Sequence, residues 1–158
     1  MKNMMKRYIA ICLLILSCAA IVCAQNRPDF SGTWKENLDK SPSKSAWLKS
    51  YVNKIDVQGT NLKVTTTMVS DRGERTYDHS YVIGQENKSK EQDGDQFTTN
   101  VKWDGNSLVF ENSEKEHDAT LTSKETWTLS DDGKTLTKTI HRSGPRGDSD
   151  QKYVLEKQ

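Results

Sequence analysis

The stretch "PDFSGTWKENLDKS", residues 28–41, decides the fold. It places Phe30, Gly32 and Trp34 on one face of a short strand in which apolar and polar residues alternate. In a small barrel the first strand crosses one end of the interior, where glycine permits close backbone approach and an indole can close the floor. A glycine two residues before a tryptophan is a weak signal alone, so its meaning depends on the rest of the chain.

The same alternation continues from Asp29 to the last residues, in short segments with a polar outer face. Between the segments stand QGTN (58–61), SDRGE (70–74), WDGNS (103–107) and SDDGK (130–134), which suit hairpin turns. The pattern predicts an all-β fold of eight to ten antiparallel strands. Because closure removes unpaired edges, we expect an up-and-down β-barrel with room for one small ligand. A flat sandwich is the alternative.

Three segments depart from this pattern. The sequence "KSAWLKSYVNK", residues 44–54, puts Trp47, Leu48 and Tyr51 at helical spacing and predicts one short helix. The polar stretches 85–96 and 142–150 predict long exposed loops.

Residues 1–24 have the composition of an export signal. Lys2, Lys6 and Arg7 precede an apolar run over 8–22 and the small residues at 23–24. The run is short for a membrane anchor, which needs about 20 apolar residues. We therefore expect a barrel domain over 25–158 in an exported protein, periplasmic or secreted. The alternative is a lipoprotein signal, "ILSC", that would acylate Cys18.

Composition narrows the classes of partner. All three cysteines lie within residues 1–24, so the domain that follows has no disulfide or thiolate chemistry. That domain carries 20 basic and 22 acidic residues, a net charge of about −2. Nothing in this balance indicates a nucleic-acid or anionic-membrane surface. We expect a monomer with no transmembrane segment after the signal.

The chain resembles the calycin superfamily, in particular small secreted bacterial lipocalin-like domains, with fatty-acid-binding proteins and avidins as cousins. The likeness rests on "FSGTWKENLDKS" (30–41), the run of hairpins, and "ETWTLSDDGKTLTKTIHR" (125–142) before a final strand with Tyr153. It implies that Gly32 and Trp34 are the first-strand motif, and that Arg142 is the basic residue that caps the tryptophan. The chain departs from larger lipocalins in its length, its lack of disulfides and its lack of their second and third motifs.

Polar residues interrupt the predicted inner face and indicate where a ligand's polar head would lie. We hypothesise that Lys138 or Arg142 anchors an anionic head. The resemblance implies a similar role for Arg142 with Tyr153, since fatty-acid-binding proteins hold a carboxylate with a late-strand arginine and tyrosine. The expected binding residues, with the apolar wall included, are His79, Tyr81, Phe97, Trp103, Phe110, Glu125, Lys138, Arg142 and Tyr153.

A structural interpretation competes with this one. Counting outward from the turn at 130–134, Glu125 pairs near residue 140, so Glu125 and Lys138 are placed for a diagonal cross-strand pair.

The case for an enzyme rests on His79, which would need a carboxylate such as Glu125 beside it, as in a barrel isomerase or cyclase. His117 and His141 fall on turns or outer positions, which leaves no three-ligand zinc cluster. No cysteine and no Gly-x-Ser-x-Gly occurs after residue 24. We therefore expect neither enzymatic activity nor a metal or cofactor.

The predicted function is encapsulation of a small apolar or amphipathic molecule. The alternative is an interaction or inhibitor module that uses the barrel as a scaffold for the loops 85–96 and 142–150. An open interior favours the first, and an interior filled by tryptophans favours the second.

Overall fold

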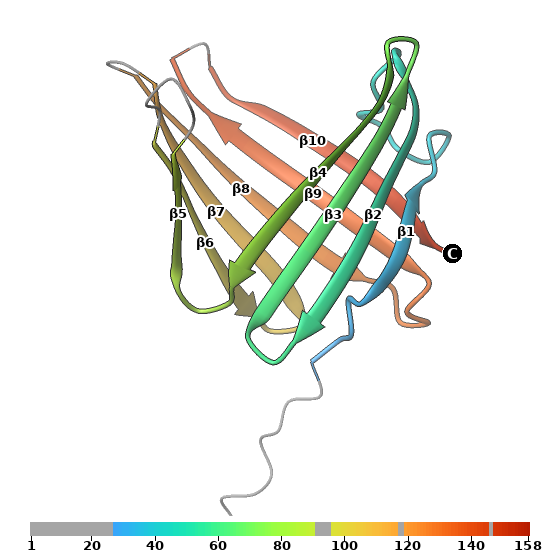
Figure 1. Ribbon diagram of the computed structural model, residues 1–158, viewed down its shortest axis with the longest axis horizontal. Coiled ribbons are helices and arrows are strands. Elements are labelled where there is room, and N and C mark those ends of the chain that lie inside the picture. Colours follow the sequence, from blue (N-terminus) through green and yellow to red (C-terminus); the bar gives the residue numbers. More distant parts are fainter. Residues whose placement is uncertain (1–26, 91–95, 117–118, 146) are drawn as a thin grey trace, which may run out of the picture.

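The computed structural model describes residues 27–90, 96–116, 119–145 and 147–158, which form one antiparallel sheet wrapped into a barrel (Figure 1). The predicted export signal and Cys18 lie outside these residues. The strands are β1 (Gly32–Glu36), β2 (Leu48–Gln58), β3 (Asn61–Ser70), β4 (Gly73–Val82), β5 (Glu86–Lys90), β6 (Gln96–Asp104), β7 (Ser107–Glu116), β8 (Ala119–Leu129), β9 (Thr135–Ser143) and β10 (Ser149–Lys157). The predicted all-β, up-and-down fold is confirmed, and its ten strands agree with the expected eight to ten.

Strand pairing follows chain order except where β1 joins β10, with Trp34 opposite Lys157. The sheet order runs from β4 through β1 and β10 to β5, so β4 and β5 are its two ends. These two strands diverge from their connecting turn (Figure 1). Near that turn the Asn87 side chain joins them, because its Oδ1 accepts the Val82 N–H (2.8 Å) and its Nδ2 donates to the Val82 carbonyl (3.3 Å). The barrel is therefore nearly closed, with one seam between β4 and β5.

The predicted helix over residues 44–54 is wrong, since β2 occupies Leu48–Gln58 and no helix occurs in the described residues. Asn53 and Ile55 are buried while Lys54 is exposed, which is the two-residue period of a strand. Pairing with β1 and β3 on both sides outweighs the helical spacing of a few residues. Trp47, which that helix would have packed, is 56% exposed.

The two predicted loops are also shorter than expected. Residues 86–90 form β5, paired with β6, while 91–95 lie outside the described residues. In the second stretch β9 extends to Ser143 and β10 starts at Ser149, with Arg142 opposite Ser149. Main-chain pairing needs no apolar side chains, so polar sequences can form strands at these positions.

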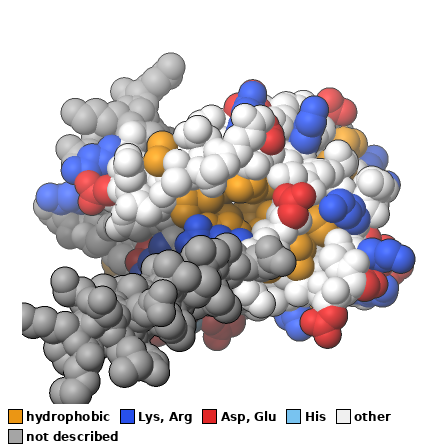
Figure 2. All heavy atoms as spheres, turned by 90° about the horizontal axis from the view of Figure 1, so that it is seen from below, with side chains coloured by type: hydrophobic (Ala, Val, Ile, Leu, Met, Phe, Trp, Pro, Cys, Tyr) orange, Lys and Arg blue, Asp and Glu red, His pale blue; other side chains and the backbone are white. Residues whose placement is uncertain are grey.

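The core fills one end of the barrel, the base, where the turns of the β2–β3, β6–β7 and β8–β9 hairpins lie. Figure 2 views this end, at which hydrophobic side chains gather in a hollow. Trp34 is fully buried, as expected for the floor, and its Nε1–H donates to the Phe30 carbonyl oxygen (2.8 Å). The buried apolar cluster comprises Phe30, Trp34, Ile55, Leu62, Val64, Ile83, Val101, Leu108, Phe110, Trp127, Leu136 and Leu155.

Gly32 and Lys157, which lies close to it on β10, explain the first-strand motif. Gly32 has a φ of 137°, and a Cβ there would lie 2.9 Å from Lys157 Cε. The Lys157 ammonium in turn lies 5.3 Å from the centroid of the Trp34 ring. Lys157, not Arg142, is therefore the basic residue that caps the tryptophan. Closure of β1 on β10 puts the last strand's final lysine beside Trp34, whereas Arg142 lies on β9.

Candidate ligand-binding site

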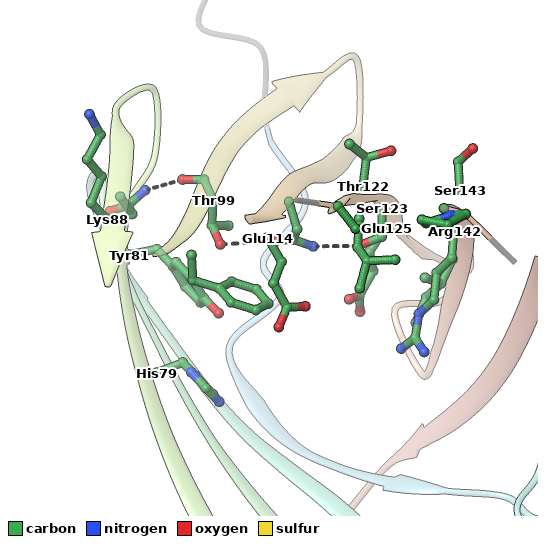
Figure 3. A pocket seen from close by; sticks show the side chains of 18 of the residues that line it. His79, Tyr81, Lys88, Thr99, Glu114, Thr122, Ser123, Glu125, Arg142 and Ser143 are labelled. Atoms are coloured by element: carbon green, nitrogen blue, oxygen red, sulfur yellow. Dashed lines mark hydrogen bonds between the residues drawn. The ribbon is translucent and has the colours of Figure 1, made fainter. Parts of the chain in front are cut away.

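Above the filled base the barrel contains a cavity of about 1050 Å³ that is partly open to solvent. Its walls come from both seam strands and from β6 to β9, so chain segments far apart in sequence contribute to one site (Figure 3). Both polar and apolar side chains line it. The lining includes His79, Tyr81, Asn87, Lys88, Phe97, Thr99, Asn112, Glu114, Leu121, Ser123, Glu125, Ile140 and Arg142.

Five of the nine predicted binding residues line this cavity, namely His79, Tyr81, Phe97, Glu125 and Arg142.

The other four lie outside that lining. Phe110 belongs to the core, with its ring centroid 4.5 Å from that of Trp127, and Trp103 packs 5.8 Å from Phe30. Lys138 is 4% exposed, and Tyr153 lies directly opposite it on β10.

Lys138 is held within the barrel by contacts with two other strands, β2 and β8. Its ammonium donates to Asn53 Oδ1 on β2 (2.5 Å) and lies 4.0 Å from the centroid of the Trp127 ring. Since β10 and β1 separate β9 from β2 in the sheet, the Lys138 side chain spans part of the interior. Lys138 Nζ is also 3.9 Å from Glu125 Oε1, and Glu125 stands opposite Ile140. The expected diagonal pair of Glu125 and Lys138 is confirmed.

Arg142 differs from Lys138 in facing the cavity. Figure 3 shows its guanidinium projecting into the space that also receives the side chains of Glu114, Glu125 and His79. Within the described residues, no carboxylate lies in ion-pair contact with Arg142. Glu125 is engaged differently, because its Oε1 accepts the Trp127 indole N–H (2.5 Å).

Phenol groups near the cavity are kept protonated by their surroundings. Burial, with smaller contributions from Glu125 and Tyr51, raises the pKa of Tyr81 to about 12. Burial likewise raises the pKa of Tyr153, although Arg142 acts in the opposite direction. An ordinary tyrosine is already protonated at neutral pH, so the raised pKa values keep both hydroxyls as hydrogen-bond donors further into the alkaline range.

Two polar side chains, Asn112 on β7 and Ser123 on β8, are absent from the predicted binding residues and form a row with Thr99 on β6. Thr99 Oγ1 donates to Asn112 Oδ1 (2.8 Å), and Asn112 Nδ2 donates to Ser123 Oγ (3.1 Å) (Figure 3). Inward placement of Asn112 follows from the two-residue period after Phe110, but its hydrogen bonds require the strand register.

His79 does not have the partner that the enzyme hypothesis requires. Its ring stacks on Tyr81 with centroids 6.2 Å apart, and no hydrogen bond joins it to Glu125 in the described part of the chain. Among the same residues, no group of three His, Cys, Asp or Glu side chains is placed to hold a metal ion. No helix long and apolar enough to cross a membrane occurs in the described ranges.

Comparison with known proteins identifies the fold. No family model and no curated protein matches the sequence. Among solved structures, the REP1-NXSQ fatty acid transporter is 17% identical, with a TM-score of 0.56 over 81% of this chain and 95% of that one. Zebrafish ileal bile acid-binding protein in complex with cholic acid is 17% identical, with a TM-score of 0.55 over 82% and 98%. Apo lipid binding protein 8 of Caenorhabditis elegans is 13% identical, with a TM-score of 0.61 over 82% and 95%.

At these identities the comparison shows the fold alone. The chain has the calycin fold, in the form seen in fatty-acid-binding proteins, as the resemblance implies. The bacterial and secreted character of the expected relatives stays a prediction.

Proposed function

We propose that this protein binds one small amphipathic molecule inside its barrel and holds it without a chemical step. The observation that carries the proposal is the cavity of about 1050 Å³ above a closed, apolar base. Small-molecule sites commonly measure about 300–1,000 Å³ and combine apolar walls with a few polar groups. The structural neighbours are a fatty acid transporter, a bile acid-binding protein and a lipid binding protein, and they support the same class of ligand.

Arg142 is the proposed anchor for the head of the ligand. It faces the cavity without an ion pair in the described residues, and a guanidinium can hold a carboxylate through two parallel hydrogen bonds. Lys138 is a poorer anchor, because its ammonium is already bound to Asn53 and lies against Trp127. Tyr81, Phe97, Leu121 and Ile140 would pack against the apolar part of the ligand.

The interaction-module alternative receives less support. An interaction module would be favoured by an interior filled by Trp34, Trp103 and Trp127. Those side chains do pack within or against the base, but the upper half of the barrel keeps its cavity.

We propose in addition that the domain is exported after cleavage behind Ala24 and acts as a monomer. Mass spectrometry of the native protein tests both points. A mature chain that starts at Gln25 supports export by a cleaved signal, and a lipid-modified Cys18 supports the lipoprotein alternative.

Ligand titration tests the binding proposal. The variant Arg142→Ala is compared with wild type and with Lys124→Ala, which removes an exposed charge from β8 outside the cavity lining. Tryptophan fluorescence reports binding of fatty acids and of alcohols with the same chains. We expect Arg142→Ala to lose about tenfold or more in affinity for the acids, and little for the alcohols. Identical profiles for wild type and Arg142→Ala with every ligand would contradict the anchor, and absence of any binding would contradict the function.

A further inference from the structure

One inward-facing row of polar residues crosses four neighbouring strands of the cavity wall. Thr99 on β6 stands opposite Asn112 on β7, Asn112 opposite Ser123 on β8, and Ser123 opposite Arg142 on β9. All four line the cavity. Directly opposed side chains on one face of a sheet have Cβ atoms about 4.5–5.5 Å apart. Ser123 and Arg142 are therefore close enough to contact one ligand group.

The hydrogen bonds along this row have a direction. The Thr99 hydroxyl donates to Asn112 Oδ1 (2.8 Å), and Asn112 Nδ2 donates to Ser123 Oγ (3.1 Å). Ser123 thus accepts from Asn112 and keeps its own single proton for another acceptor. No acceptor for that proton is bonded to Ser123 within the described residues.

The start of the row is firmly placed. Thr99 is 6% exposed, and its carbonyl oxygen accepts from Asn87 Nδ2 (3.2 Å). In this arrangement the Asn112 amide sets the direction of both bonds, because its oxygen accepts from Thr99 and its nitrogen donates to Ser123. The row therefore orients the lone pair and the proton of Ser123 from one end.

We propose that the Ser123 hydroxyl and the Arg142 guanidinium form one donor pair that binds the carboxylate of the ligand. Thr99 and Asn112 act as positioning residues that direct the Ser123 proton toward the cavity. The two oxygens of a carboxylate can accept from the two donors at once, and hydrogen bonds to a charged acceptor are stronger than neutral ones. This inference rests on the proposed function and names the residues and the head group of that site.

The charges deeper in the cavity favour the same position for the head. Glu125 lies on the same face of β8, two residues closer to the base than Ser123. Its carboxylate repels an anion that moves deeper, and Lys138, 3.9 Å away, offsets part of this charge. An anionic head is therefore held near Ser123 and Arg142, with its chain directed toward Tyr81 and Phe97.

The test compares three variants with dodecanoate and dodecanol as probes. Ser123→Ala removes the donor, Ser123→Thr keeps a hydroxyl, and Ser113→Ala removes a serine of β7 that does not line the cavity. We expect Ser123→Ala to weaken dodecanoate binding about tenfold and dodecanol binding much less. Ser123→Thr should stay within about threefold of wild type, and Ser113→Ala should equal wild type.

Asn112→Leu tests the positioning role. Leucine has a similar size and adds no charge, but it cannot donate to Ser123, so the Ser123 proton is no longer directed toward the ligand. We expect it to weaken dodecanoate binding in the wild-type background and to add little further loss once Ser123 is alanine, which a purely structural effect would not do.

The outcomes separate this inference from the function on which it rests. Wild-type protein that binds neither probe overturns both. If wild type binds dodecanoate but Ser123→Ala binds it equally well, or loses as much affinity for dodecanol, the donor pair is overturned while the binding function stands. Thermal unfolding of each variant identifies any that has lost its fold, and Ser123→Thr then decides the result.

Discussion

Lys138 offers the sharpest test of how the barrel tolerates a charge in its interior. Lys138→Met keeps a long unbranched side chain and removes the ammonium. The Asn53 carbonyl then loses a buried donor, and the Trp127 ring loses the cation at 4.0 Å. Glu125 loses a partner at 3.9 Å, but its indole hydrogen bond from Trp127 remains.

The magnitude follows from these contacts. A buried hydrogen bond from a charged donor is worth about 1.5–3 kcal/mol, and a desolvated cation over an aromatic ring about 2 kcal/mol. The attraction between Lys138 and the largely buried Glu125 carboxylate, 3.9 Å away, adds to this loss. Wild-type protein pays a desolvation cost to bury the Lys138 ammonium. The variant avoids this cost, which offsets part of the lost stability. We expect Lys138→Met to lower the free energy of unfolding by about 3 kcal/mol, a large part of the roughly 5–15 kcal/mol of a typical domain.

Urea unfolding followed by tryptophan fluorescence measures the effect, because Trp127 lies beside the changed group. Lys152→Met, an exposed lysine on β10, is the matched control and should change stability by less than about 0.5 kcal/mol. In Lys138→Met the buried Asn53 Oδ1 has lost its hydrogen-bond donor. Adding Asn53→Leu removes this unpaired acceptor and should recover part of the lost stability. A Lys138→Met protein within about 0.5 kcal/mol of wild type would refute the reasoning, since the interior contacts would then contribute nothing net.

Three further changes probe the motif, the seam and the cavity. Gly32→Ala should cost about 1–3 kcal/mol in urea unfolding, because φ is 137° and the new Cβ would meet Lys157 Cε at 2.9 Å; an unchanged midpoint would contradict this. Asn87→Ala should speed hydrogen exchange of the Val82 amide, which donates to its side chain, and unaltered protection there would show that the seam is held otherwise. Tyr81 should ionise in ultraviolet titration near pH 12 instead of 10, since burial raises its pKa to about 12. The stability linked to its protonated phenol is complete below about pH 10 and is lost as the pH rises through 12, so Tyr81→Phe should remove this loss; ionisation near pH 10 would contradict the burial.

Most of the fold was predictable from the sequence because each strand repeats the same choice of one apolar and one polar face. The predicted helix failed for a physical reason. Trp47, Leu48 and Tyr51 satisfy helical spacing, yet Tyr51, Asn53 and Ile55 satisfy strand spacing in the same stretch. A stretch this short is compatible with both a helix and a strand. Pairing with β1 and β3 makes it a strand.

The sequence of each strand predicts which of its side chains face the interior, but not which of them touch residues of other strands. Alternation places His79, Tyr81 and Arg142 toward the interior, where the cavity meets them. Which residues touch depends on register between strands, and no local pattern contains it. The closure of β1 on β10 decides that Lys157 caps Trp34, as the β7–β8 register decides that Asn112 reaches Ser123.

The division of the barrel into a filled base and a polar cavity has a consequence for binding. The base packs its apolar residues around Trp34, and the cavity lies above it. The cavity wall includes β4 and β5, each of which pairs with a single neighbouring strand in the described part of the chain. Segments with fewer pairings open at lower free energy than the core. Local opening and ligand exchange should therefore occur at the same seam, above the bonds that Asn87 makes to Val82, while the base stays closed.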